Sequence, residues 1–114
     1  MANMYLVFSA PPAGVSPEEY DRWYHDHIRE NLEAPGFVGG QRFSLAPAVT
    51  KDGPPAAHTH LALYEFVGPL ERWRTDLESR IESGKIVLPD YFPQIRFGSW
   101  ECTPIDERLI VPER

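Results

Sequence analysis

Two pairs of histidines, each with one residue between them, are the first candidates for chemistry in this sequence. His25 and His27 lie in DRWYHDHIRE (residues 21–30), and His58 and His60 open HTHLALYEFV (residues 58–67). An imidazole titrates near neutral pH, so it can serve as a general acid, a general base or a metal ligand. Which role is open to each pair depends on the element that carries it.

The first pair is predicted to lie on a helix over residues 17–32. Ser16 can cap the helix N-terminus, Pro17 suits the first helical position, and Glu19 completes a capping box. Pro35 disfavours helical geometry at the residue before it, and Gly36 follows, so the helix should end near residue 32.

His25 and His27 should point to different sides of this helix. Residues two apart are separated by about 200° around the axis, so the two rings cannot chelate one metal. His27 shares its side with residues three and four positions away. That inward face is expected to hold Tyr20, Trp23, Tyr24, His27, Ile28 and Asn31. In this aromatic setting His27 is a candidate general base or acid with a pKa near the working pH, or alternatively a core histidine hydrogen-bonded to a carbonyl.

The second pair is predicted to lie at the start of a strand, where residues i and i+2 share a face. His60 and Tyr64 therefore point the same way. If that face meets the helices, both can line a cavity with His27; if not, they lie at a subunit interface. A tyrosine hydroxyl can donate to a developing oxyanion, or it can belong to a core aromatic. No third or fourth ligand accompanies the His58–His60 pair, so no metal is expected.

Candidate catalytic residues are thus His27, Tyr64 and His60. Arg42 lies within a predicted strand and could bind a substrate carboxylate, or pair with Glu65 or Glu101. Phe92 belongs to LPDYFP, a loop with two aromatics that could form a pocket wall, whereas Trp73 and Trp100 are expected in the core or in a lid. The expected substrate-binding set is Tyr20, Trp23, Tyr24, Arg42 and Phe92.

Six elements must position these residues. Strands are predicted over 4–10, 37–47, 58–67 and 94–104, and a second helix over 70–85. The order β-α-β-β-α-β defines an α+β ferredoxin-like domain covering residues 1–114, with a four-stranded antiparallel sheet and both helices on one face. The strands are apolar on both faces, so a second copy is expected to cover the other face in a homodimer. A turn is expected at Asp52 and Gly53, and RLIV (residues 108–111) could add an edge strand or dock on a partner.

Composition narrows the partners. The net charge of −6 and the scattered basic residues argue against nucleic acid and anionic membranes. A single cysteine, Cys102, excludes an internal disulfide and favours a reducing compartment. No apolar run approaches the roughly 18 residues of a membrane span, and no basic leader opens the chain, so a cytoplasmic location is expected. No phosphate-binding or dinucleotide motif occurs, so no cofactor is expected.

The segment EEYDRWYHDHIRENLEAPGFVGGQRF resembles the dimeric α/β-barrel superfamily, and is most similar to its EthD-like members, which often show WYxxH on a helix followed by PGF and RF. HTHLALYEF looks like the third strand of that family. The resemblance implies a homodimer with a pocket between helices and sheet. The superfamily includes isomerases, cyclases, decarboxylases, dehydratases, haem-dependent and cofactor-free monooxygenases, so the fold alone does not select a reaction.

Three functions follow as hypotheses. The first is a cofactor-independent enzyme performing lyase, isomerase or cyclase chemistry on a hydrophobic, ring-containing, aromatic or polyketide-like molecule. In that case His27 is the acid or base, and Tyr64 or His60 polarises a carbonyl. The second is a non-catalytic module that binds a small ligand or supports a partner enzyme, which predicts a pocket without convergent polar groups. The third is a haem-dependent or cofactor-free monooxygenase.

Overall fold

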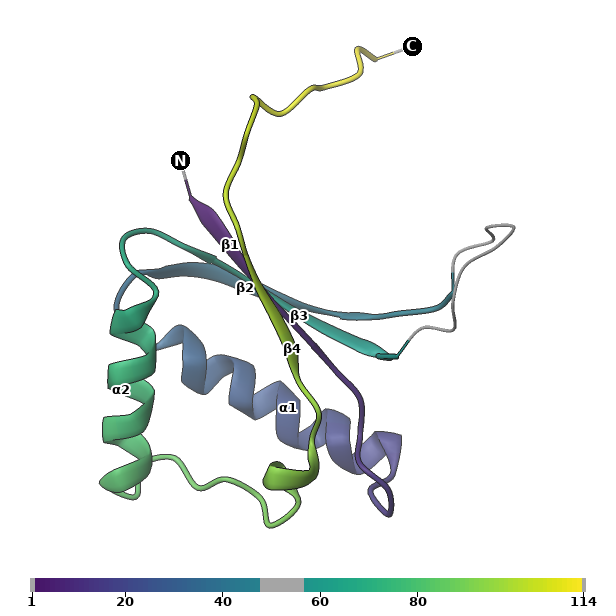
Figure 1. The fold of residues 1–114 in the computed structure, drawn as a ribbon, viewed down its shortest axis with the longest axis vertical. Coiled ribbons are helices and arrows are strands. Elements are labelled where there is room, and N and C mark those ends of the chain that lie inside the picture. Colours follow the sequence, from purple (N-terminus) through teal and green to yellow (C-terminus); the bar gives the residue numbers. More distant parts are fainter. Residues whose placement is uncertain (1, 48–56, 114) are drawn as a thin grey trace.

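The described part of the protein contains one antiparallel sheet with two helices on one of its faces (Figure 1). The computed structural model describes residues 2–47 and 57–113. In chain order the elements are β1 (Asn3–Ser9), α1 (Pro17–Leu32), β2 (Phe37–Ser44), β3 (His60–Phe66), α2 (Glu71–Glu82), the short 3₁₀ helix η1 (Phe92–Gln94) and β4 (Gly98–Cys102). The predicted ferredoxin-like α+β class is confirmed. The turn predicted at Asp52 and Gly53 lies outside the described residues.

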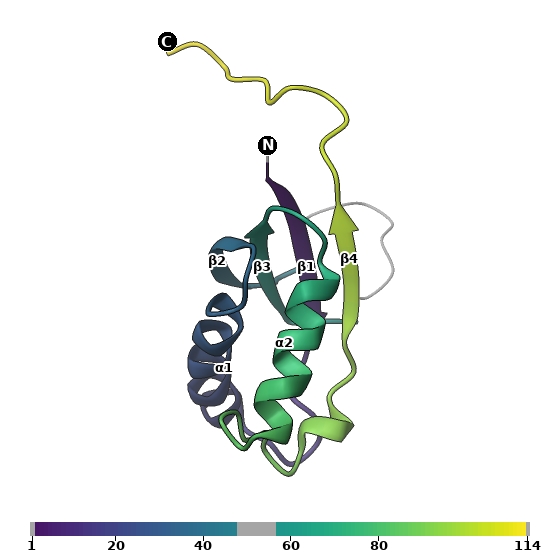
Figure 2. The ribbon, with the colours of Figure 1, turned by 90° about the vertical axis from the view of Figure 1, so that its left-hand side faces the viewer.

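The sheet has the strand order β2-β3-β1-β4, and every neighbouring pair is antiparallel. Tyr5 of β1 lies opposite Tyr64 of β3. The Tyr64 hydroxyl accepts from Asn31 of α1, and the Tyr5 ring lies 5.2 Å from that of Trp73 in α2, so both rings are on the face of the sheet that the two helices cover (Figure 2). The register of β2 shifts between Phe37 and Gly39, which marks a β-bulge or similar irregularity at the start of the strand. His60, Tyr64 and Phe66 therefore all face the helices, which answers the question that the sequence left open.

Helix α1 has the bounds predicted from its caps. The Ser16 hydroxyl accepts a hydrogen bond from the Glu19 backbone N–H at 3.1 Å, and Gly36 takes a φ of +95° in the turn that follows the helix. The conformation at Gly36 is left-handed, which favours glycine. The buried residues of the helix, Tyr20, Tyr24, His27, Ile28 and Asn31, match the predicted inward face, with Trp23 half-buried beside them.

Helix α2 is shorter than predicted mainly at its C-terminus, where Ser83 is the C-cap and Gly84 takes a φ of +81°. Its apolar stripe, including Trp73 and Leu77, is half-buried. Arg80 fastens α2 to α1 by donating from Nη1 to the Glu30 carbonyl at 2.6 Å, while its Nε donates to Asp76 within α2 at 2.8 Å. Strand β4 is also shorter than predicted, since the residues before it form η1 and a connecting turn.

The second face of the sheet is open in the single chain. Val7 and Ser9 of β1 are buried under the helices, whereas Met4 is 41% exposed on the opposite face, which is the face that a second copy is expected to cover. Trp100, expected in the core or a lid, is 67% exposed on that outer face. Within a single antiparallel sheet only the helix-covered side excludes water.

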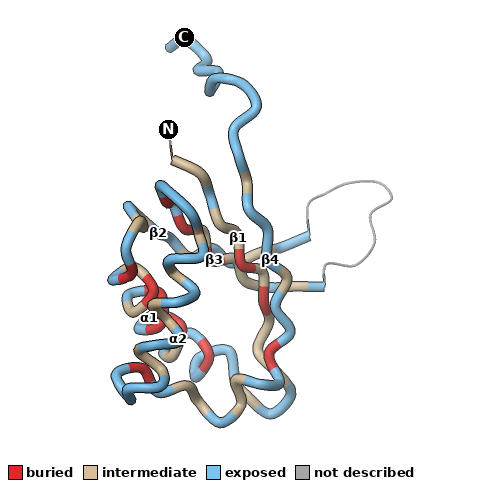
Figure 3. The backbone as a smooth tube through the Cα atoms, turned by 60° about the vertical axis from the view of Figure 1, so that its left-hand side comes forward, coloured by how far each residue is buried: buried red, intermediate tan, exposed pale blue. Residues whose placement is uncertain are grey.

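The chain beyond β4 leaves the body of the protein without forming a strand (Figure 1). Figure 3 shows this segment in the exposed class, and Ile105 and Leu109 are 94% and 93% exposed. The edge strand considered for RLIV is thus not formed in the single chain. Among the described residues, no helix combines the length and apolarity needed to cross a membrane.

Candidate functional site

A cavity of about 170 Å³ lies between the helices and the sheet. Side chains from β1, β3, β4 and both helices line it, together with the segment around η1. Aromatic and aliphatic groups dominate the lining. The polar side chains that reach it are Tyr5, Tyr24, His27, Asn31, Tyr64 and Ser99. A mostly apolar lining with a few polar groups is typical of a small-molecule site.

His27 enters this cavity from α1 and is held in place on two sides. Its Nδ1 lies 3.3 Å from Glu30 Oε1, and its ring stacks on Trp23 with the centroids 4.8 Å apart. A neutral imidazole donates from one nitrogen and accepts at the other. Because a carboxylate accepts, Nδ1 is assigned the hydrogen and Nε2 the lone pair. The Glu30 contact therefore defines the tautomer in which His27 can act as a base.

Burial is the main cause that lowers the pKa of His27 to about 4, and the positive charge of Arg80 adds to it. The prediction of a pKa near the working pH is therefore not met. At neutral pH the ring is uncharged, so His27 has no proton of its own to donate and acts first as an acceptor. An imidazolium formed during a reaction would be strongly acidic and would return its proton readily.

The same pKa predicts how stability depends on pH. The unfolded chain titrates His27 near 6.5 and the folded chain near 4, so the unfolded state binds more protons between these values. Stability from this group is complete above about pH 6.5 and falls as the pH drops towards 4, by about 3 kcal/mol in total. Urea unfolding of the wild type at pH 7.5 and pH 4.5 would measure the loss. His27→Gln should lack this component, and equal pH slopes in the two proteins would contradict the prediction.

Tyr64 is the second polar group of the cavity, and Asn31 holds it. Asn31 Nδ2 donates to the Tyr64 hydroxyl at 3.0 Å, and Trp73 Nε1 donates to Asn31 Oδ1 at 3.0 Å. Burial raises the pKa of Tyr64, so its hydroxyl stays protonated. Because the hydroxyl oxygen accepts from Asn31, its own hydrogen is left for another acceptor.

The other predicted substrate-binding residues divide into two groups. Phe92 lines the cavity, with its ring centroid 6.4 Å from that of His27, and Tyr24 lines it from α1. Trp23 supports His27 from behind without lining the cavity. Tyr20 is fully buried, and its hydroxyl donates to Ser9 Oγ at 2.6 Å, so it acts within the core.

His60 and Arg42 both contact the carboxylate of Asp21, away from the cavity. His60 Nε2 lies 3.3 Å and Arg42 Nη2 2.8 Å from Asp21 Oδ1, on the helix-covered side of the sheet. The Arg42 guanidinium also lies over the Tyr24 ring, 4.8 Å from its centroid. The ion pair considered for Arg42 thus forms with Asp21 instead of Glu65 or Glu101. Neither His60 nor Arg42 lines the cavity that contains His27 and Tyr64.

Asn31 and Trp73 were not singled out as site residues from the sequence. A signal for Asn31 existed, since it follows His27 by four positions on the same helical face. No comparable spacing links Trp73 to this cluster, because it lies on another helix. Within residues 2–47 and 57–113, no three His, Cys, Asp or Glu side chains come together as they would around a metal.

The arrangement is that of an α+β ferredoxin-like fold with a candidate site between the helices and the sheet. No family model matches the sequence, and no curated protein matches it.

Several chains of solved structures are similar to this chain, among them the following two. The protein At3g17210 from Arabidopsis thaliana is 14% identical with a TM-score of 0.61, covering 96% of this chain and 100% of its own. The hydroxynitrile lyase from Passiflora edulis is 18% identical with a TM-score of 0.60, covering 93% of this chain and 97% of its own. These likenesses establish the fold, which a hydroxynitrile lyase also uses.

Proposed function

We propose that this protein is a cofactor-independent enzyme that performs lyase-type acid–base chemistry on a small apolar molecule with one ring. The observation that supports the proposal most is that His27 and Tyr64 both line one cavity. A hydrogen-bond acceptor and a protonated donor then face the same small space from a helix and a strand. A base and an oxyanion donor are the two groups that cleavage next to a hydroxyl requires.

The two residues take separate roles in the proposed reaction. His27 Nε2 removes the proton from a substrate hydroxyl, and Tyr64 donates a hydrogen bond to the same oxygen. The oxygen electron pair forms a carbonyl as the adjacent bond to carbon breaks, and the leaving carbanion takes the proton back from the imidazolium. The Glu30 carboxylate keeps the ring in the required tautomer throughout.

The size of the cavity limits the substrate. An apolar cavity of about 150 Å³ is large enough for benzene. The cavity of about 170 Å³ in this protein would hold one ring with a short substituent. A fused polyketide would need more space. The proposed substrate class is therefore a single-ring hydroxy compound, such as an aromatic cyanohydrin or a β-hydroxy ketone.

Mandelonitrile is the natural first probe, because the lyase from Passiflora edulis with this fold is named for hydroxynitriles. Benzaldehyde release above the rate in buffer, saturating with substrate, would support the proposal. Tyr64→Phe should retain the fold and lose about 10²- to 10³-fold in rate, since it removes one oxyanion donor. The proposal fails if mandelonitrile and single-ring β-hydroxy ketones are not turned over and benzaldehyde does not shift the NMR signals of the His27 ring.

A non-catalytic binding protein would need only an apolar pocket. The convergence of a base and a donor in one cavity favours the enzyme instead. An EthD-like affiliation fits the WYxxH helix, in which Trp23 and Tyr24 precede His27, and we retain it as part of the proposal.

We also propose that the protein is a homodimer that joins the outer faces of two sheets. Trp100, Met4 and Phe43 are 67%, 41% and 39% exposed there, and a second copy would remove this apolar surface from water. Light scattering at micromolar concentration should give about 26 kDa, twice the 13.0 kDa of the chain. Trp100→Glu should yield monomers, whereas Val87→Glu, an equally drastic change in an exposed loop, should not. A wild-type mass of one subunit would contradict the prediction.

A further inference from the structure

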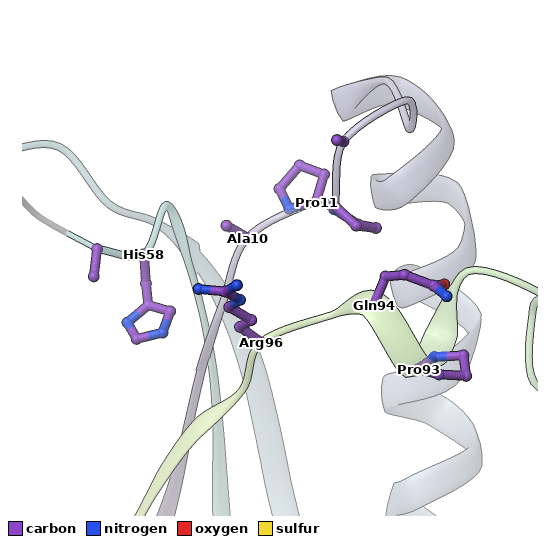
Figure 4. A pocket seen from close by; sticks show the side chains of 9 residues that line it. Ala10, Pro11, His58, Pro93, Gln94 and Arg96 are labelled. Carbon is purple, nitrogen blue, oxygen red and sulfur yellow. The ribbon is translucent and has the colours of Figure 1, made fainter.

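A second and larger hollow of about 560 Å³ lies at one end of the sheet (Figure 4). The segment that follows β1 forms one wall, the segment between η1 and β4 forms another, and His58 closes the hollow just before β3. No residue lines both this hollow and the cavity of His27. Its volume falls within the range of small-molecule sites. It is therefore a separate candidate site, which the proposed chemistry does not use.

Among the described residues that line this hollow, every polar side chain can donate a hydrogen bond. These side chains are Arg96, His58 and Gln94, and no carboxylate is among the described lining residues. The lining thus differs from the chain as a whole, in which 17 acidic residues outnumber 11 basic ones. Figure 4 shows the Arg96 guanidinium between His58 and the Ala10–Pro11 segment, with Gln94 further along. A guanidinium presents paired N–H groups that match a carboxylate.

The position of His58 is set by its surroundings. Its ring lies 6.0 Å from that of Phe8, measured between centroids, and faces Gly98 at the start of β4. A Cβ added at Gly98 would come within 3.3 Å of His58 Cε1, so glycine leaves the room that this ring occupies. The imidazole is thereby held beside Arg96, where one of its nitrogens can donate to the same anion.

The remaining walls are apolar and stiff. Pro11, Pro12 and Pro93 line the hollow with Ala10 and Ala13. A proline has no backbone N–H and a fixed φ, so these walls offer shape without competing donors. An apolar body could lie against them while its charged end reaches Arg96.

We propose that this hollow binds a small organic carboxylate. The carboxylate lies on Arg96 with His58 beside it, and the apolar part of the molecule packs against the prolines. The site works independently of the chemistry proposed for His27. The protein as a whole is acidic, but the hydrogen-bond donors around this hollow would still attract an anion locally.

Calorimetric titration of the full chain with benzoate tests this proposal, with benzyl alcohol as the neutral probe of matching size. Benzoate should bind saturably and at least about tenfold more tightly than benzyl alcohol, which corresponds to one charge-assisted contact. Arg96→Gln should remove that advantage. Arg29→Gln makes the same change at an exposed position on α1 and should leave benzoate binding intact.

Further outcomes separate this site from the inner cavity. His27→Gln should bind benzoate as the wild type does, so a failure of the proposed chemistry would leave this result standing. Equal affinity for benzoate and benzyl alcohol, or wild-type affinity in Arg96→Gln, would overturn the proposal. Inorganic phosphate that competes as well as benzoate would overturn the role given to the proline walls.

Discussion

Replacing His27 with Gln is expected to lower kcat for mandelonitrile cleavage by about 10²- to 10⁴-fold, the usual contribution of a positioned acid or base. Glutamine keeps most of the volume and a polar end beside Glu30, but it cannot take up a proton. The fold should be retained, because His27 lies at the cavity wall and the planar amide of glutamine can pack on Trp23 as the imidazole does. The measurement is initial-rate kinetics on the wild type and the variant.

His25 provides the matched control for this experiment. It lies two residues away on the same helix but is exposed. His25→Gln should leave kcat and KM unchanged, and a comparable loss in both variants would point to damage to α1 rather than lost chemistry. Wild-type turnover by His27→Gln would remove His27 from the mechanism altogether.

The pH dependence of the rate distinguishes a base from a structural histidine. Because burial lowers the pKa of His27 to about 4, the free enzyme should keep a constant kcat/KM down to about pH 5 and lose activity below it. A histidine with an ordinary pKa would instead give a decline that begins above pH 6. The low pKa thus provides a signature that belongs to this residue in this cavity.

The helix that carries His27 was predictable because its signals are local. Ser16 and Pro17 mark the start, Gly36 follows the end, and the 3.6-residue period selects the inward face. These patterns act within one or two turns of chain, so the sequence displays them directly. The split between a buried His27 and an exposed His25 follows from the same geometry.

The contacts that define the site could not be predicted in the same way. Asn31 and Tyr64 are 33 residues apart, and Asn31 and Trp73 are 42 residues apart. No spacing rule relates positions on different elements, since their pairing depends on how helices and strands pack. The partner of Arg42 was missed for this reason, and the pKa of His27 depends on Arg80 of the other helix. Composition and periodicity identify candidates, and tertiary packing decides which of them meet.

Replacing Asn31 is expected to destabilise the core. Asn31→Leu keeps a side chain of similar size in α1. It removes both hydrogen bonds of Asn31, the one to Tyr64 and the one from Trp73. Tyr64 is 1% exposed and Asn31 3% exposed, so water cannot readily replace the lost partners. A buried polar group left without a partner costs about 1–3 kcal/mol. The free energy of unfolding should therefore fall by about 2–4 kcal/mol in urea denaturation.

A double-mutant cycle with Tyr64→Phe isolates the contact. In a protein that already lacks the Tyr64 hydroxyl, Asn31→Leu no longer leaves that group unpaired, so its cost should be smaller by about 1 kcal/mol or more. Asn3→Leu, at the half-buried start of β1, is the control and should change stability little. A loss below about 0.5 kcal/mol in Asn31→Leu would place it among ordinary surface changes and contradict the structural role of the network. The Asn31 amide also orients the Tyr64 hydroxyl. Asn31→Leu should therefore lower turnover as well as stability, because the hydroxyl is no longer held in place. This result would link the stability of the core to the proposed oxyanion contact.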